Sequence, residues 1–194
     1  MKDFFEQIER KVYDAVKKAM GCILEEVGNE NVYAAALVTD EDCVSLFLAV
    51  NTYEYMRKKD LENLEFMRQY LSEDKIRKIE DGTDSLTKWT PSEWGYSDGT
   101  QSDLVEVSKM LFAKEQENST EYEANKPLFF DAVTSALKRI VEEQVLDRDT
   151  GEITYFISLS DGDGIDEIEN ASAKLLNSES VYEMFLHLYD GSEF

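Results

Sequence analysis

The chain contains few of the residues that build covalently braced or nucleophilic sites. Its 194 residues include two cysteines, two prolines and one histidine. Two cysteines are too few for a disulfide framework, so a reducing compartment, the cytoplasm, is expected. A single histidine leaves little material for a zinc site or a Cys–His dyad. We therefore expect Cys22, Cys43 and His187 to be structural, and no cofactor.

Long apolar runs and basic residues are also scarce. No apolar run approaches the roughly 20 residues that a membrane-spanning helix needs. The first residues include acids where a signal peptide has its apolar stretch. Lys and Arg number 20 against 42 Asp and Glu, which gives a net charge of −22. Because such a surface repels nucleic acid and anionic membranes, the expected partner is a basic protein or a cation.

The chain has enough apolar residues to fold despite this charge. Hydrophobic residues make up 42% of the sequence and aromatic residues 11%, which is sufficient for a sizeable core. No convincing linker divides the sequence, so residues 1–194 are expected to form a single acidic globular domain. Residues 1–97 carry a net charge of −7 and residues 98–194 one of −15. The C-terminal quarter is therefore expected to build most of the acidic surface.

The apolar spacing predicts an α+β fold. A first helix carries apolar residues three or four positions apart from Phe5 to Ile23. The apolar runs Val32–Val38 and Cys43–Val50 flank a polar turn and predict an antiparallel hairpin, and Ile153–Leu159 predicts a third strand. We expect a small antiparallel sheet of about three strands packed with several helices. Neither hairpin run alternates cleanly, which predicts cover on both faces of the sheet.

The most concentrated polar segment runs from Asp161 to Glu167, directly after the third predicted strand. Its carboxylates would oppose a phosphate, and counting from Asp161 places Asp166 where a calcium loop requires glycine. The simplest interpretation is that Asp161 or Asp163 caps the following helix, whose positive end the other acids favour. A cation site formed by Asp161, Asp163 and Asp166 remains an alternative.

The second unusual segment contains both tryptophans. Residues 81–102 lack a regular pattern, yet they include Trp89, Trp94 and Tyr96. The two indoles could fill the core and pin this segment down, or they could form a binding surface, where tryptophan and tyrosine are enriched. In a third interpretation, Glu93 lies between the indoles with a raised pKa and acts as a general acid.

Three stretches together resemble a known family. They are Val32–Asp42, Trp89–Trp94 and the aromatic strand with its polar turn, Tyr155–Gly164. In these, the chain resembles the small bacterial proteins grouped as domain-of-unknown-function family 4303, over about Val12 to Tyr189. That family has no established activity, so the resemblance implies no functional residue. In size, charge and fold class alone, the chain also resembles acidic immunity proteins of bacterial toxin systems, such as the SMI1/KNR4-like superfamily.

These features favour an acidic cytoplasmic binding protein, an immunity-type inhibitor of a basic, nuclease-like bacterial toxin. The alternatives are a metal-dependent enzyme that uses the Asp161, Asp163 and Asp166 cluster, and a non-catalytic housekeeping domain. The oligomeric state stays open. The residues expected to contact the partner come from the two unusual segments: Trp89, Glu93, Trp94, Tyr96, Asp161, Asp163, Asp166 and Glu167.

Overall fold

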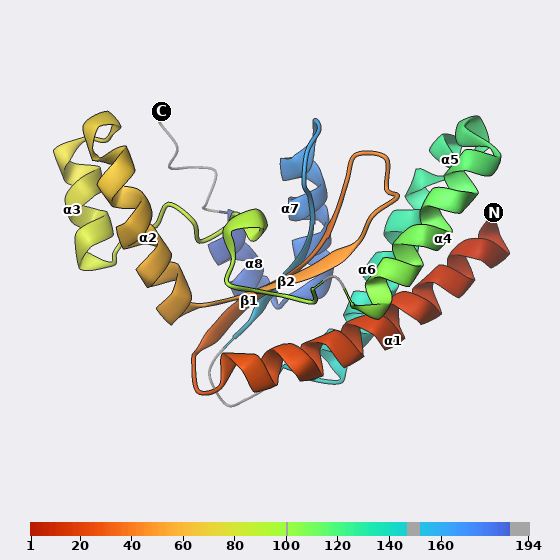
Figure 1. The fold of residues 1–194 in the computed structure, drawn as a ribbon, viewed down its shortest axis with the longest axis horizontal. Helices are drawn as coiled ribbons and strands as arrows, with labels where there is room; N and C mark the ends of the chain where they lie inside the picture. The colour runs from red at the N-terminus through yellow and green to blue at the C-terminus, as the bar shows by residue number, and fades with distance from the viewer. Residues whose placement is uncertain (100, 147–151, 187–194) are drawn as a thin grey trace.

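The computed structural model describes residues 1–99, 101–146 and 152–186, and His187 lies outside them. The described residues form an α+β fold (Figure 1). Its first half comprises α1 (Lys2–Val27), β1 (Val32–Thr39), β2 (Phe47–Thr52), α2 (Tyr53–Met67), the 3-10 helix η1 (Arg68–Tyr70), α3 (Glu73–Asp81), the 3-10 helix η2 (Pro91–Glu93) and β3 (Tyr96–Ser97). The second half comprises α4 (Asp103–Glu117), α5 (Ser119–Ala124), α6 (Lys126–Glu142), β4 (Thr154–Leu159), α7 (Ile165–Leu176) and α8 (Glu179–Leu186). None of the described helices has the length and hydropathy needed to cross a bilayer.

Within the described residues, the sheet has four strands in the order β3-β2-β1-β4. β1 and β2 pair antiparallel, as the predicted hairpin requires. β4 pairs with β1 in parallel, so the prediction of an entirely antiparallel sheet is wrong. The fourth strand is β3, a two-residue strand that pairs antiparallel with the outer side of β2 at Ala49 and Val50. The sheet is therefore mixed.

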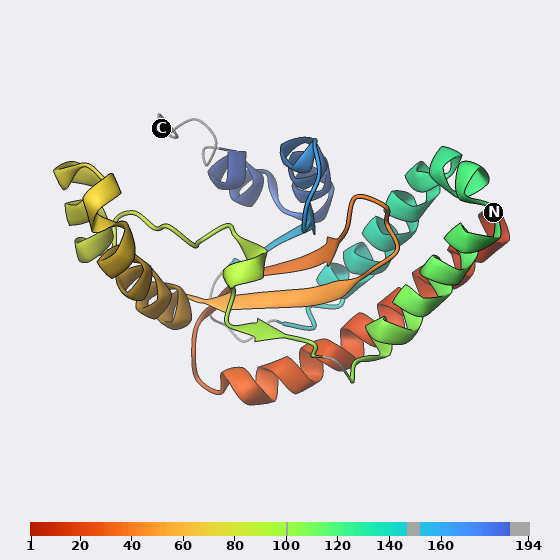
Figure 2. The same cartoon turned by 45° about the horizontal axis from the view of Figure 1, so that its top comes forward.

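Helices cover both faces of the sheet, as the unbroken apolar runs predicted. All eight residues of β1 are buried. On one face, α1, α4 and α6 pack over the sheet side chains Ala35, Leu37, Leu48 and Ile157. On the opposite face, α7, α8 and residues 86–96, which we call the tryptophan segment, cover Ala36 and the rest of the smaller core (Figure 2).

Local sequence accounts for the helix boundaries. The buried residues of α1 repeat at three- and four-residue spacing, and the helix ends at Gly28, whose φ of +63° suits glycine. Thr52 begins α2 as an N-cap, because its Oγ1 accepts a hydrogen bond from the backbone N of Tyr55 at 3.1 Å. Proline stands in the first turn of α6, where its missing N–H costs nothing.

The pair of helices α2 and α3 extends away from the sheet. Figures 1 and 2 show this pair, joined by η1, projecting from one end of the molecule. We call residues 53–81 the arm. Leu64 and Ile79 are buried within it, and the Arg57 guanidinium donates hydrogen bonds to the carbonyl oxygens of Ile79 and Glu80. An ion pair of 2.6 Å between Arg68 and Glu80 joins η1 to α3.

Candidate functional site

The parallel pairing of β1 and β4 brings two acidic segments together. Thr39 and Leu159 are partners at the ends of these strands, and the backbone N of Ser160 donates to the carbonyl oxygen of Thr39 at 2.7 Å. The segments that follow, residues 40–42 and 160–167, therefore lie at the same edge of the sheet (Figure 1). Six exposed acids on these segments form what we call the acidic edge: Glu41, Asp42, Asp161, Asp163, Asp166 and Glu167.

Asp161 links the two segments. Its Oδ1 accepts hydrogen bonds from the backbone N of Glu41 at 3.3 Å and from the Ser160 hydroxyl at 3.2 Å. Gly164 occupies the N-cap position of α7, and no side chain caps that helix. The interpretation that Asp161 or Asp163 caps α7 is therefore wrong. Asp161 instead joins the turn after β4 to the turn after β1.

A glycine allows the two turns to approach closely. Gly162 has a φ of +95°, and a Cβ at this position would lie 3.0 Å from side-chain atoms of Glu41. Any other residue would meet both backbone strain and a steric conflict. Gly162 thus allows the turn after β4 to lie against Glu41, while the carboxylates of Asp161 and Asp163 on either side of it stay exposed.

Asp40 shapes the neighbouring loop. Its carboxylate accepts hydrogen bonds from the backbone N of Val44 at 2.9 Å and from the Ser45 hydroxyl at 2.5 Å. Within this loop, Cys43 is buried, and burial raises the pKa of its thiol to about 12. Because the thiol stays protonated at neutral pH, Cys43 is a structural residue, as expected.

The acidic edge has little positive charge beside it. Among the ion pairs of the described residues, only one reaches this edge, between Lys126 Nζ and Asp42 Oδ1 at 3.8 Å. Lys126 is also held by Glu123 at 2.5 Å, which divides its charge between two acids. Across the described ranges, no three His, Cys, Asp or Glu side chains converge as a group that could hold a metal ion.

The tryptophan segment packs against the opposite face of the sheet from α1. Trp94 is only 8% exposed, and its Nε1 donates to the carbonyl oxygen of Lys88 at 3.2 Å. Its ring centroid lies 5.7 Å from that of Phe156 on β4, and Trp89 lies 5.2 Å from Phe185 on α8. Both indoles therefore take part in packing, in agreement with the first of the three interpretations of this segment.

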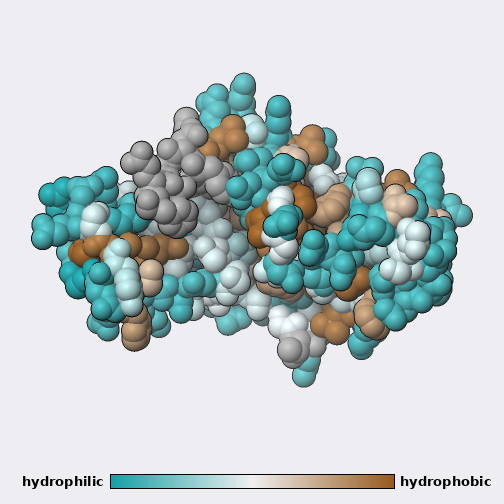
Figure 3. Space-filling model, turned by 90° about the horizontal axis from the view of Figure 1, so that it is seen from above, coloured by the Kyte–Doolittle hydropathy of each residue, from teal (hydrophilic) through white to brown (hydrophobic). Residues whose placement is uncertain are grey.

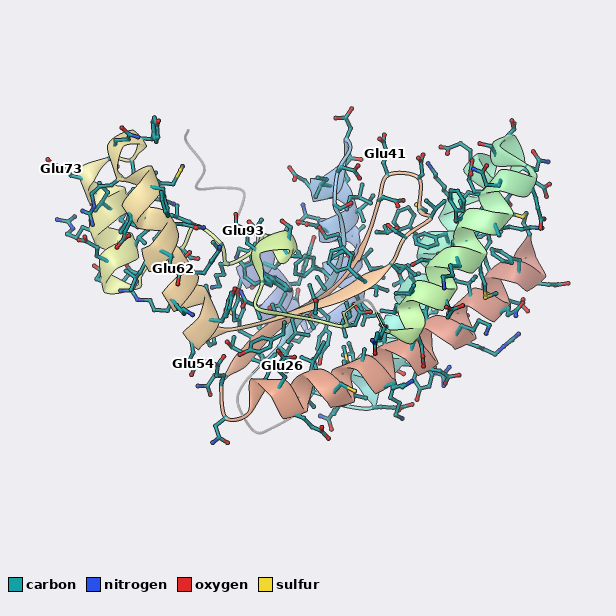
Figure 4. The ribbon with its side chains drawn as sticks, viewed as in Figure 1. Glu26, Glu41, Glu54, Glu62, Glu73 and Glu93 are labelled. Atoms are coloured by element: carbon teal, nitrogen blue, oxygen red, sulfur yellow. The ribbon has the colours of Figure 1, made fainter. Side chains whose placement is uncertain are left out.

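Glu93 and Tyr96 make separate contacts on either side of Trp94. Glu93 accepts a hydrogen bond from Asn63 Nδ2 of the arm at 2.8 Å. The Tyr96 hydroxyl donates to Glu30 at 2.7 Å, and desolvation together with this bond raises the pKa of Tyr96 to about 12. Figure 4 shows Glu93 on η2 and Glu41 in the β1–β2 loop well apart on the same side of the molecule. The structure therefore divides the expected partner-binding residues into two groups.

A comparison of the sequence with models of protein families finds a match. A model described as a domain of unknown function, DUF4303, matches residues 12–178. The chain belongs to the DUF4303 family. The predicted resemblance is thereby confirmed over nearly the whole range expected. No curated protein and no solved structure matches the chain. The likeness to immunity proteins stays a prediction.

The acidic edge of this DUF4303 domain includes two acids that the sequence did not indicate. Glu41 and Asp42 appeared only as part of a hairpin turn. Their proximity to Asp161 depends on the direction of β4, which no local pattern encodes. With them, the edge combines six exposed carboxylates on two turns fixed by backbone and side-chain hydrogen bonds. Such a surface can attract and orient a positively charged partner.

Proposed function

We propose that this DUF4303 domain is an acidic binding protein that holds a basic protein on its acidic edge. The partner class is a nuclease-like bacterial toxin, and the domain acts as its cytoplasmic immunity-type inhibitor. The observation that carries the proposal is the meeting of six exposed carboxylates at one edge of the sheet, with Lys126 as the only base paired to them among the described residues.

Electrostatic attraction explains how such a site works. Nucleases bear cationic clefts that receive phosphate groups, so a rigid anionic edge can enter the same cleft and exclude the substrate. Complementary charge steers the encounter and raises association rates well above those of neutral pairs. The hydrogen bond from Glu41 N to Asp161 and the close contact at Gly162 preorganise the carboxylates, which lowers the ordering cost of binding.

The tryptophan segment has an indirect part in this proposal. Trp94 is buried and Trp89 packs against α8, so these rings stabilise the sheet whose end carries the acidic edge. Glu93 and Tyr96 hold the same segment against Asn63 and Glu30. We assign direct contact with the partner to Asp161, Asp163, Asp166 and Glu167, joined by Glu41 and Asp42.

The test compares two charge reversals of equal size. Basic proteins captured from the native host on the immobilised domain at low salt supply the candidate partner. Association kinetics are then measured for wild type, for Asp163→Lys with Glu167→Lys, and for Asp14→Lys with Glu25→Lys. Asp14 and Glu25 are exposed on α1, which packs on the opposite face of the sheet from α7. Both variants change the net charge by the same amount.

The edge reversal should slow association by about tenfold at low salt and flatten its dependence on ionic strength. The α1 reversal should change the rate far less, because Asp14 and Glu25 lie outside the docking surface. Equal effects of the two variants would show that only net charge matters. Either that result or the absence of any stoichiometric basic partner would overturn the proposal.

A further inference from the structure

The arm has a core of its own but leaves large apolar side chains in solvent. The described residues include eight large hydrophobic side chains that are exposed, and five of them lie in the arm. They are Tyr53, Leu61, Phe66, Met67 and Tyr70. Phe66 is 76% and Tyr70 74% exposed, and they stand four residues apart around the junction of α2 with η1. Figure 3 shows hydrophobic surface at the end of the molecule where the arm projects.

The arm also differs from the rest of the chain in charge. Residues 53–81 hold seven bases and eight acids, a net charge of −1, so the other 165 residues carry −21. Several arm charges pair internally, such as Lys78 with Asp74 at 2.8 Å. α1 also has a net charge of −1, but none of the exposed large hydrophobic side chains lies on it. The arm therefore combines apolar surface with a charge that another highly acidic protein can approach without strong repulsion.

A second copy of the chain is the occupant that this charge distribution favours. Two bodies of charge −21 repel one another, and only in the arm does a nearly neutral charge coincide with exposed large hydrophobic side chains among the described elements. Because the arm projects from one end, contact between two arm tips places the two bodies at opposite ends of the dimer (Figures 1 and 2). α2 alone has 15 residues, about 22 Å at a rise of 1.5 Å per residue. The separation between the bodies then exceeds the Debye length of about 8 Å at physiological ionic strength, so their repulsion is screened.

The residues beside the aromatic pair suit a symmetric contact. Residues at three- and four-residue spacing lie on the same side of a helix. This spacing places a base and an acid on the same side as the two aromatic residues: Lys59, Glu62, Phe66 and Tyr70. Neither Lys59 nor Glu62 makes an ion pair within the described part of the chain. A two-fold interface presents the same patch from both subunits, and a patch with charges of both signs can complement itself.

We propose that the arm is a homodimer interface, in which Phe66, Met67 and Tyr70 of two copies pack together at the tips of α2 and η1. This surface is separate from the acidic edge, so a dimer would present two acidic edges. The proposal stands or falls independently of the proposed function.

Sedimentation velocity of the full chain tests this proposal, between about 1 and 100 μM protein at about 0.15 M NaCl. We expect a dimer at this salt concentration, and its dissociation constant should rise when NaCl is lowered to about 0.01 M, where the Debye length grows to about 30 Å and the bodies repel one another. Phe66→Ser with Tyr70→Ser should raise the dissociation constant at least about tenfold. Both side chains are exposed, so the circular dichroism spectrum should not change.

Phe112→Ser is the matched control, because Phe112 is an exposed aromatic residue on α4, outside the arm. It should leave the dimer intact. As a positive test of proximity, Gln69→Cys in a Cys22→Ser background should form a disulfide-linked dimer on air oxidation, because Gln69 lies in η1 at the arm tip. A wild-type chain that stays monomeric at about 100 μM would overturn the proposal. A dimer that survives the arm substitutions would also overturn it.

Discussion

The carboxylate of Asp98 contributes to the fold as a hydrogen-bond acceptor rather than through its negative charge. Its Oδ1 accepts a hydrogen bond from the backbone N of Leu48 at 2.8 Å, which extends the sheet edge beyond β3. Burial raises the pKa of this carboxyl above its ordinary value. The ionised form is therefore disfavoured in the folded protein, whereas the hydrogen bond requires only an acceptor, which an amide also supplies.

Asp98→Asn should accordingly be tolerated at neutral pH. A raised folded-state pKa means that protonation of Asp98 stabilises the fold, and this stabilisation is lost as pH rises through the folded-state pKa. The variant does not titrate, so its melting temperature relative to wild type should increase between about pH 4 and pH 7. Thermal melts of both proteins across this range measure the difference. A relative melting temperature that fell with rising pH would contradict the assignment.

Trp94 is the residue whose truncation should cost most among those of the tryptophan segment. Trp94→Ala removes a buried ring that packs near Phe156 and loses the hydrogen bond to Lys88. We expect the free energy of unfolding to fall by about 3–5 kcal/mol, as measured by urea denaturation. Phe112→Ala, at an exposed site on α4, should cost less than about 1 kcal/mol. Similar losses for the two variants would show that Trp94 is not a core residue.

Among the elements, those with a strong local pattern were predictable from sequence. The spacing in α1 and the antiparallel pairing of β1 with β2 depend on neighbours in the chain, and the structure confirms both. The connecting loop is longer than predicted, because β2 begins at Phe47 rather than at Cys43. β3 was missed because Tyr96 and Ser97 are too few to form an apolar pattern. The direction of β4 depends on how the chain returns through the helices between β2 and β4. The antiparallel assignment was therefore wrong, and the sequence did not show that Glu41 and Asp42 lie beside Asp161.

Asp60 connects α2 to residues that lie more than 25 positions further along the chain. It is 1% exposed on α2, and its Oδ1 accepts hydrogen bonds from the backbone N of Leu86 and from both the backbone N and the hydroxyl of Thr87. This carboxylate attaches the tryptophan segment to the arm. The sequence offered only its position near the basic cluster Arg57-Lys58-Lys59, which does not reveal such a long-range contact.

Asp60→Ala should loosen that attachment. The change leaves buried donors of Leu86 and Thr87 without their acceptor, so the free energy of unfolding should fall by about 2–4 kcal/mol. Hydrogen exchange at the amides of Leu86 and Thr87 should accelerate more than exchange in β1. Glu62→Ala, on the exposed face of the same helix, should cost less than about 0.5 kcal/mol. Unchanged protection at Leu86 and Thr87 would contradict this role for Asp60.

At the scale of the whole molecule, the uneven charge is the dominant feature. A net charge of −21 on the residues outside the arm creates self-repulsion that opposes the compact state. Exposed ion pairs such as Lys18–Asp103 relieve little of it, because pairs in solvent contribute only about 0–1 kcal/mol. The acidic edge concentrates six acids where only one base reaches them, so binding of a basic partner would relieve repulsion that the free domain retains.

The stability of the domain should therefore depend on salt and on where a charge is removed. Adding salt should raise the melting temperature, because screening weakens the repulsion between carboxylates.

Removing charge from the acidic edge should have a similar effect. At low ionic strength, Glu41→Gln with Asp163→Asn should raise the melting temperature by about 2–4 °C. Glu62→Gln with Glu65→Gln removes the same charge from the nearly neutral arm and should have a smaller effect. The difference between the two pairs should shrink at about 0.5 M NaCl, where the Debye length falls to roughly 4 Å. Equal shifts for both pairs at low salt would show that the repulsion is spread over the whole surface, and the acidic edge would then lose its special electrostatic character.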